Sequence, residues 1–325
     1  MINYFEEEVA IKRSKLKKDI RITSGKCTRI LLILGVMVQV LSIAIMFIVK
    51  TRSNNINGDM SDYLIGYLPC ILGDIIAIIL GAKITNIKIK RDMFCKNEAK
   101  GSFIALGAIS CIGVGIISSI IYSIYSFILE LGGIIIPAPD FNFPTDNPFM
   151  LTLILVYVCV LGPILEEIIF RGFILKSMQR YGNLTAIIVT SVLFSMFHLN
   201  LVQFVPPILI GFVLAFITIK SKSIVPGIIA HMFNNTVAFA MSLIPSTETT
   251  SQYIILTIYT FGSLIGLLFF IREYGKEIII TIKEDNKLLK TRQKIAVSFT
   301  SVWSIIYIVF YVGMIGLGFL LTNFF

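Results

Sequence analysis

The stretch LGPILEEIIFRGFIL, residues 161–175, decides the fold, because it carries three charged side chains in an otherwise apolar run. These are Glu166, Glu167 and Arg171. The whole chain has 56% hydrophobic residues, only 14% charged residues and a mean hydropathy of +0.88. Such a composition excludes an ordinary soluble globular protein. The sequence therefore predicts an all-α, multi-pass integral membrane protein, in which charged side chains within a span are costly and point to function.

Nine segments are apolar enough to be candidate spans, given that a span needs about 20 mostly apolar residues. They lie near residues 30–49, 63–82, 103–129, 149–170, 184–200, 201–219, 224–244, 252–271 and 299–321. The fifth and sixth meet without a polar loop, so we expect their junction to stay below the far membrane surface. The sequence predicts a polytopic helix bundle of about eight or nine transmembrane helices with an intramembrane cavity that faces the cytoplasm.

The basic residues separate by side of the membrane. If nine spans alternate in direction, 26 of the 28 Lys and Arg residues fall on one side and only Lys50 and Arg52 on the other. The positive-inside rule then predicts a cytoplasmic N-terminus. A basic surface that faces anionic lipid explains the net charge of +9, and no aromatic-interleaved basic groove suggests a nucleic-acid partner. The five cysteines show no CxxC pairing, which indicates neither a disulfide framework nor a thiolate metal site.

The spacing of the ionisable residues predicts where they face. Glu167 and Arg171 are four residues apart, so they share one helix face and can form an ion pair, while Glu166 points elsewhere. Gly182 and Asn183 predict a turn between two antiparallel helices. Glu166 lies 16 residues before Gly182 and His198 lies 16 after it, so both rise about 24 Å from the turn and can face each other at one depth.

A third helix brings His231 and Asn235, again four residues apart, to the same shallow layer. A carboxylate and an imidazole that reach one water molecule can orient and deprotonate it. A second imidazole and an amide can stabilise the oxyanion that forms when water attacks a peptide carbonyl. These residues therefore suggest a hydrolase, with Glu166 and His198 acting on water.

The motifs resemble those of a known family. E-E-x-x-x-R at 166–171, F-x-x-x-H at 194–198 and H-x-x-x-N at 231–235 occur in the order found in the CAAX protease and bacteriocin-processing (CPBP, or ABI) family of intramembrane proteases, which is related to the CAAX prenyl endopeptidase. The resemblance extends over about residues 150–240. It implies that Glu166 and His198 activate water, that His231 and Asn235 stabilise the oxyanion, and that Glu167 and Arg171 support them. Phe194, one turn before His198, packs either the wall of the site or only the core, and core packing is the simpler expectation.

With this resemblance, the chain divides into four parts. We expect a basic cytoplasmic segment at 1–29, accessory transmembrane helices at 30–145, a CPBP-like catalytic core at 146–246, and C-terminal helices at 247–325. The last part contains a connector, 272–296, that either lies as an amphipathic segment near the membrane or is a solvated linker. The expected partners are the lipid bilayer and a membrane-associated peptide or protein substrate, and the sequence leaves the oligomeric state open.

Several alternatives remain open at this level. Glu166, His198 and His231 could supply three ligands to a catalytic zinc ion, although the local spacing of a zinc-protease motif is missing and the resemblance favours a mechanism without a cofactor. The same residues could build a non-catalytic scaffold, such as a bacteriocin-immunity or regulatory protein of the same fold. A transporter is a third class, but its polar sites would be expected in both halves of the chain. Asp74 matches none of the motifs and is expected to pair with a neighbouring helix or a water.

Overall fold

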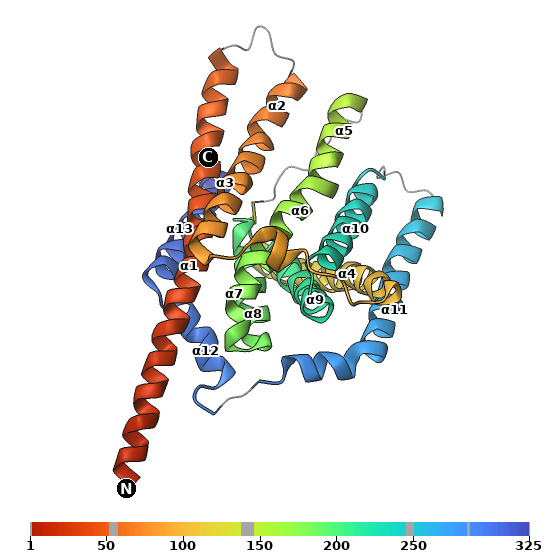
Figure 1. Cartoon of the computed structure of the whole chain (residues 1–325). Coiled ribbons are helices and arrows are strands. Elements are labelled where there is room, and N and C mark those ends of the chain that lie inside the picture. Colours follow the sequence, from red (N-terminus) through yellow and green to blue (C-terminus); the bar gives the residue numbers. More distant parts are fainter. Residues whose placement is uncertain (1, 52–57, 138–145, 245–249, 285–286, 325) are drawn as a thin grey trace.

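The computed structural model describes residues 2–51, 58–137, 146–244, 250–284 and 287–324 (Figure 1). Every regular element in these ranges is a helix, which confirms the predicted all-α class. Six helical stretches are long and apolar enough to cross a membrane, judged by length and composition. They are Glu6–Thr51, Met60–Thr85, Gly101–Leu131, Pro148–Tyr181, Thr250–Ile282 and Val302–Asn323.

The other three expected spans are helical but do not meet that standard. Two are shorter apolar helices, α8 (Asn183–Phe197) and α9 (Val205–Ser221), and the third is α10 (Val225–Ser242). The prediction of eight or nine spans thus exceeds the six that length and composition support. The physical reason is visible in α8, which is buried along most of its length by protein. A helix that packs inside the bundle need not match the bilayer thickness.

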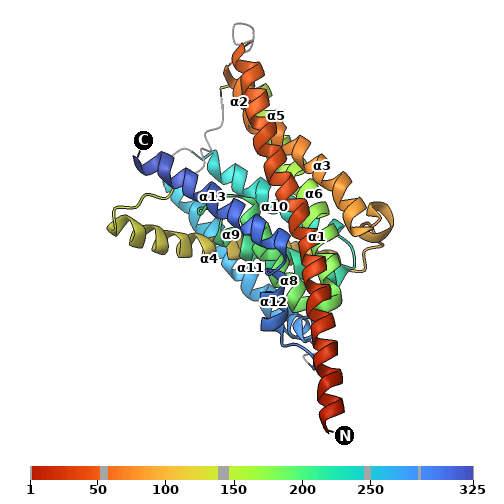
Figure 2. The same cartoon turned by 90° about the vertical axis from the view of Figure 1, so that its left-hand side faces the viewer.

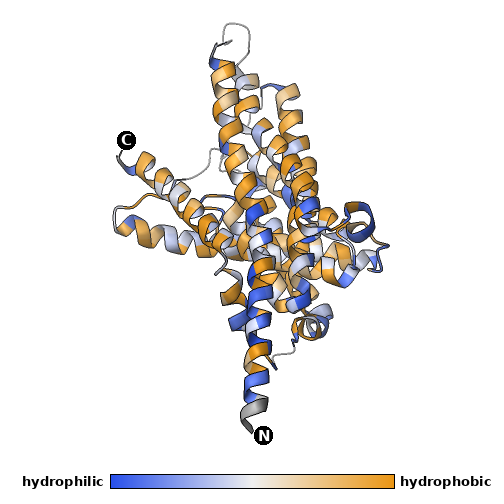
Figure 3. Ribbon diagram, turned by 60° about the vertical axis from the view of Figure 1, so that its left-hand side comes forward, coloured by the Kyte–Doolittle hydropathy of each residue, from blue (hydrophilic) through white to orange (hydrophobic). Residues whose placement is uncertain are grey.

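The first helix, α1 (Ile2–Thr51), is a single continuous rod of 50 residues that projects beyond the bundle at its N-terminal end (Figures 1 and 2). It runs without a break through residues 29 and 30, so the basic segment expected at 1–29 and the first span form one helix. Hydrophilic residues of α1 are concentrated in its N-terminal half, where they alternate with hydrophobic ones, and its C-terminal half is mainly hydrophobic (Figure 3). A basic segment followed directly by an apolar span is the pattern that the positive-inside rule associates with the cytoplasmic surface of a membrane.

The next span is interrupted where Pro69 predicts a break. Helix α2 (Gly58–Gly66) ends before Tyr67, and α3 (Leu68–Thr85) begins with Pro69 in its first turn, where a missing backbone N–H costs least. A short π-helical turn, η2 (Ile89–Met93), then leads to α4 (Gly101–Leu131). Helix α4 lies obliquely to α1 (Figure 2) and packs against α9, α10 and α11.

The segment that carries the first motif is nearly continuous helix, but two parts of it are wider than an α-helix. In chain order it consists of α5 (Pro148–Val156), the π-helix η3 (Tyr157–Leu161), α6 (Gly162–Glu167), the π-helix η4 (Ile168–Leu175), α7 (Lys176–Met178) and the 3-10 turn η5 (Gln179–Tyr181). Pro163 has no N–H to donate to the preceding turn, and Gly162 donates instead to Tyr157, five residues back. π-helical turns of this kind occur frequently at functional sites.

The turn predicted at Gly182 is present. Gly182 has φ +122°, which side-chain-bearing residues rarely adopt, and α8 begins at Asn183. A Cβ at Gly182 would also collide with the carboxyl group of Glu284. The main hydrophobic core lies around this hairpin and joins α1, η4 and α8 through residues such as Ile20, Ile174 and Phe194.

The C-terminal part packs back onto that hairpin. Helix α11 (Thr250–Ile282) continues well into the expected connector and turns beneath the bundle in Figure 1, and α12 (Thr291–Ser298) and α13 (Val302–Phe324) follow. Glu284 lies between α11 and α12, with its side chain only 1% exposed. Around Glu284 the described part of the connector therefore packs against protein, while Ile279 and Ile280 at the end of α11 are exposed.

Glu284 completes the start of α8. Since Gly182 has no side chain to cap the helix, the carboxylate of Glu284 accepts a hydrogen bond from the backbone N–H of Thr185 at 2.6 Å. The same side chain accepts hydrogen bonds from Thr291 at 2.8 Å and from the ammonium of Lys294 at 3.1 Å. A carboxylate at a helix N-terminus is also stabilised by the helix dipole.

We expect replacement of this carboxylate to destabilise the fold. In Glu284→Gln, buried donors lose a charged acceptor, which should cost about 1–3 kcal/mol. Glu98→Gln, which removes an exposed ion pair with Lys222, serves as the control and should change stability by less than about 0.5 kcal/mol. The unfolding midpoint of the purified protein in detergent measures both effects. Equal midpoints for the two variants would contradict the proposed capping role.

The same contact predicts a dependence on pH. Burial by itself raises the pKa of Glu284, but the hydrogen bonds from Thr185, Thr291 and Lys294 outweigh it and hold the pKa below the ordinary value of 4.5. Because the folded state has the lower pKa, the contribution is fully present above about pH 4.5 and is lost as the pH falls through the folded-state pKa. Wild type should therefore lose its stability advantage over Glu284→Gln in acid.

Candidate functional site

Two of the three charged residues of the opening stretch, Glu167 and Arg171, are buried and paired. Arg171 Nη1 donates to Glu167 Oε1 at 2.6 Å, and both side chains are 0% exposed. The guanidinium also lies 4.6 Å from the centroid of the Phe194 ring and donates a 3.5 Å hydrogen bond to the carbonyl of Gly211. The i,i+4 spacing thus yields the expected ion pair even though π-helix η4 begins between its two members. Two charges that would each be very costly in hydrocarbon offset one another.

His231 joins this pair to the second glutamate. Its Nδ1 lies 3.0 Å from Glu167 Oε1, and its Nε2 lies 3.7 Å from Glu166 Oε2. The first distance is a hydrogen bond in which the ring donates to the carboxylate, and the second is longer than a direct hydrogen bond. Glu167 therefore does more than neutralise Arg171, because it also fixes the orientation of His231, as a carboxylate beside a functional histidine often does.

His198 is held at the end of α8. That helix ends at Phe197, three residues earlier than the expected span, so His198 is the C-terminal cap. Its Nδ1 is 2.9 Å from the carbonyl of Phe194. A carbonyl can only accept, so Nδ1 donates and the neutral ring keeps Nε2 as an acceptor. Phe194 packs edge-on against this ring, with centroids 5.2 Å apart.

The chain after His198 is an ordered, non-helical junction that spans residues 198–204. Leu199 has φ +54°, a left-handed conformation that costs a non-glycine residue about 1–2 kcal/mol. The side chain of Asn200 donates to the carbonyl of His198 at 2.8 Å and accepts from the backbone N–H of Gln203 at 2.7 Å. These hydrogen bonds offset the conformational cost of Leu199. Backbone strain of this kind is typical of functional sites.

Glu166 and His198 line the same cavity, which has a volume of about 280 Å³. Glu166 is 17% exposed at its side chain, in contrast to the fully buried Glu167. The structure therefore brings together Glu166 of α6, His198 at the end of α8 and His231 of α10, with His231 Nε2 3.7 Å from Glu166 Oε2. The carboxylate of Glu166 and the imidazole of His198 give the cavity two hydrogen-bond acceptors for the hydrogens of water.

Asn235 lies one helical turn beyond His231 and is not among the residues that line the cavity. Its amide Nδ2 donates to the carbonyl of Val158 at 3.0 Å, and its Oδ1 accepts from Asn234 at 3.2 Å. An amide nitrogen carries two hydrogens, so one donor remains beyond the bond to Val158. Val158 belongs to π-helix η3, whose wider turn thus provides the acceptor that orients Asn235.

The described side chains around Glu166 do not form a metal site. No three His, Cys, Asp or Glu side chains in the described parts of the chain are arranged to hold one metal ion. His231 Nδ1 is already bonded to Glu167, which would have to be given up or shared if that nitrogen were a ligand. The expected zinc alternative therefore finds no fitting set of ligands in this arrangement.

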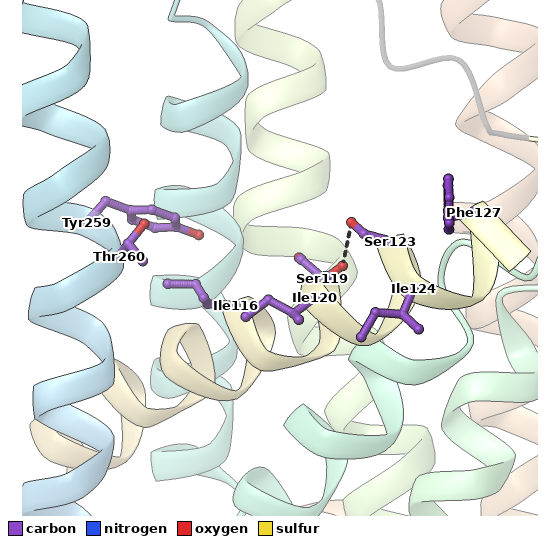
Figure 4. Close-up of a pocket in the computed structure, with 8 residues that line it drawn as sticks. All are labelled: Ile116, Ser119, Ile120, Ser123, Ile124, Phe127, Tyr259 and Thr260. Carbon is purple, nitrogen blue, oxygen red and sulfur yellow. Dashed lines mark hydrogen bonds between the residues drawn. The ribbon is translucent and has the colours of Figure 1, made fainter.

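A larger cavity lies elsewhere and lacks the chemistry of a hydrolytic site. It occupies about 570 Å³ between α4 and α11 (Figure 4), and apart from Tyr259 it contains no ionisable side chain. The hydroxyl of Ser123 donates back to the carbonyl of Ser119 within α4, so it is not aimed at a ligand. The remaining lining residues are Ile116, Ile120, Ile124, Phe127 and Thr260. Size alone does not make this groove the functional site.

The sequence motifs leave out a third ionisable residue of the 280 Å³ cavity. Asp74, which was expected to pair with a neighbouring helix or a water, is 2% exposed and lines the cavity with Glu166, and its Oδ1 has no hydrogen-bond partner among the described residues. The available signal was its position as a carboxylate inside an apolar span, which by default suggests function. Cys70 and Tyr157 line the same cavity, but neither side chain is charged, so nothing in the sequence marked them as functional.

Comparison with known proteins agrees with this assembly of motifs. Residues 148–237 match the family described as Type II CAAX prenyl endopeptidase Rce1-like. Over 101 residues the chain is 34% identical to a Bacillus subtilis (strain 168) protein named "Putative membrane peptidase YdiL", a match that covers 31% of this chain and 41% of that protein. No solved structure matches. The resemblance to the CAAX protease family is thereby confirmed for the segment that carries all three motifs, and this family is one of membrane proteases.

Proposed function

We propose that the protein is an intramembrane endopeptidase in which Glu166 and His198 activate water to hydrolyse a peptide bond of a membrane-associated substrate. The observation that carries this proposal is that Glu166 and His198 line one cavity while His231 Nε2 lies 3.7 Å from Glu166, together with the family match of residues 148–237. The chain spans about two fifths of the length of the curated relative it matches, so the activity of the whole protein is our own inference.

The proposed reaction begins with a water held between Glu166 and Nε2 of His198. Glu166 takes one proton as the water oxygen bonds to the carbonyl carbon, and His198 accepts a hydrogen bond from the second hydrogen. The carbonyl oxygen becomes an oxyanion, which accepts hydrogen bonds from the remaining amide hydrogen of Asn235 and from His231. When the carbon–nitrogen bond breaks, the proton on Glu166 passes to the leaving amine.

Glu167 and Arg171 have supporting roles in this proposal. Glu167 receives the Nδ1 hydrogen of His231, so Nε2 is the nitrogen turned toward Glu166. Arg171 balances the charge of Glu167, and Phe194 lies against both Arg171 and the two histidines. No step requires a metal ion. We further propose that the basic face of the bundle, including the N-terminal end of α1, lies on the cytoplasmic side.

Comparative peptidomics of membranes tests the proposal in cells. Cells that carry wild type should contain membrane-derived peptides that are missing from cells with Glu166→Gln, because that variant keeps the side-chain size but lacks the base. These peptides would also identify the substrate. If Glu166→Gln gives the same peptides and supports the same phenotype, the chain is a non-catalytic scaffold or immunity protein of the same fold.

A further inference from the structure

Asp74 has no role in the reaction proposed above, yet it faces the same cavity as Glu166 and His198. It comes from α3, far outside the segment that matches the family, and it is 2% exposed with Oδ1 unpartnered among the described residues. An unpaired carboxyl group inside a membrane span is costly. A ligand that donates to it would remove that cost.

Part of the cavity wall is apolar. Leu31 and Val38 come from α1 and Phe310 from α13, and all three lie outside residues 148–237. The cavity of about 280 Å³ is at the lower end of typical ligand pockets. It therefore suits one long side chain better than a stretch of several residues.

Charge indicates which kind of side chain fits. No Lys or Arg lines the cavity, so Asp74 and Glu166 share its wall with His198 and without a permanently charged cation. The nearest buried cation, Arg171, is bonded to Glu167. Two carboxyl groups in one low-dielectric space favour a positively charged hydrogen-bond donor.

We propose that Asp74 is the recognition residue for a basic side chain of the substrate, a lysine or arginine near the cleaved bond, whose methylene stem lies against Leu31, Val38 and Phe310. This assignment rests on the proposed function only in that the bound side chain belongs to a peptide that the protein cleaves. Recognition of the cation itself can be measured without any cleavage. It also assigns α1, α3 and α13, which the family match does not include, to the selection of substrate.

Cys70 offers a reporter in the same cavity. It is partly exposed and lines the cavity with Asp74, while Cys27, Cys111 and Cys159 are buried. In a Cys95→Ser background, the labelling rate of Cys70 by N-ethylmaleimide should fall when n-hexylammonium, which mimics a lysine side chain, occupies the cavity. The neutral n-hexanol is the matched control probe.

We expect n-hexylammonium to protect Cys70 at a concentration at least about tenfold lower than n-hexanol, as one charge-assisted hydrogen bond implies. Asp74→Asn should remove this difference while leaving the labelling rate without ligand unchanged, which shows that the cavity is intact. Equal protection by the two probes in wild type, or an unchanged difference in Asp74→Asn, would overturn the proposal. A Cys70 that no reagent reaches would overturn it as well, because a closed cavity receives no side chain.

Cleavage of quenched-fluorescent nonapeptide libraries separates recognition from catalysis. Each library has one fixed position occupied by lysine, arginine or norleucine, and the other positions are randomised. Wild type should prefer lysine or arginine over norleucine by about tenfold in kcat/KM, and Asp74→Asn should cleave all three alike. If amine protection of Cys70 depends on Asp74 but no library is cleaved, recognition of the cation stands and the proposed proteolysis fails.

Discussion

Glu166→Gln is expected to abolish peptide hydrolysis while leaving the fold unchanged. Loss of a general base typically costs about 10²- to 10⁴-fold in rate, and here the same carboxyl group also returns the proton to the leaving amine. Its side chain is 17% exposed and forms no hydrogen bond within the described parts of the chain, and His231 Nε2 approaches it only to 3.7 Å. The fold therefore depends little on its charge.

The purified protein in lipid vesicles provides the measurement, with a peptide taken from the comparison of membranes as substrate. The rate of product formation and the midpoint of thermal unfolding are recorded for the same samples. An intact midpoint with a rate reduced at least about 10²-fold supports the assignment. A Glu166→Gln variant that cleaves at the wild-type rate would remove Glu166 from the mechanism.

Arg171→Met is expected to have the largest effect on stability. The substitution keeps an apolar stem but leaves Glu167 without its 2.6 Å partner in a position that is 0% exposed. Loss of one member of a buried ion pair typically costs about 3–5 kcal/mol. His231 also depends on Glu167 for its orientation, so the turnover of the folded fraction should fall too.

The double variant Glu167→Gln/Arg171→Met is the matched control, since it removes both charges together. Replacement of a whole buried pair is often close to neutral for stability, so the double variant should recover most of the unfolding midpoint in detergent. It should not recover activity, because His231 would then face an amide in place of a carboxylate. Additive losses of stability in the double variant would show that the two charges do not support each other.

The parts of the site that depend on local spacing could be predicted from the sequence. Glu167 and Arg171 form an ion pair because four residues is close to one helical turn, and Gly182 makes the turn because few other residues tolerate its φ of +122°. The equal distances of Glu166 and His198 from that turn predicted a common depth, and both side chains line one cavity.

The parts that depend on packing between distant segments could not be predicted. Asp74 reaches the cavity because α3 packs against α6 and η4, and no local pattern encodes that contact. Glu284 caps α8 across about a hundred residues of chain, in the place of a side chain that Gly182 lacks. The early end of α8 at Phe197 depends on the left-handed conformation of Leu199, a residue whose type normally disfavours it.

The central claim is that Glu166 and His198 face one cavity, and cross-linking tests it most directly. Cysteines are placed at positions 166 and 198 of a variant from which the five native cysteines have been removed, and membranes are treated with the short fluorescent cross-linker dibromobimane. The account predicts a fluorescent intramolecular cross-link for this pair and none for positions 166 and 259, since Tyr259 lines the separate groove between α4 and α11. If cysteines at 166 and 198 each react with a maleimide but never cross-link, the two residues do not meet and the proposed hydrolytic centre is wrong.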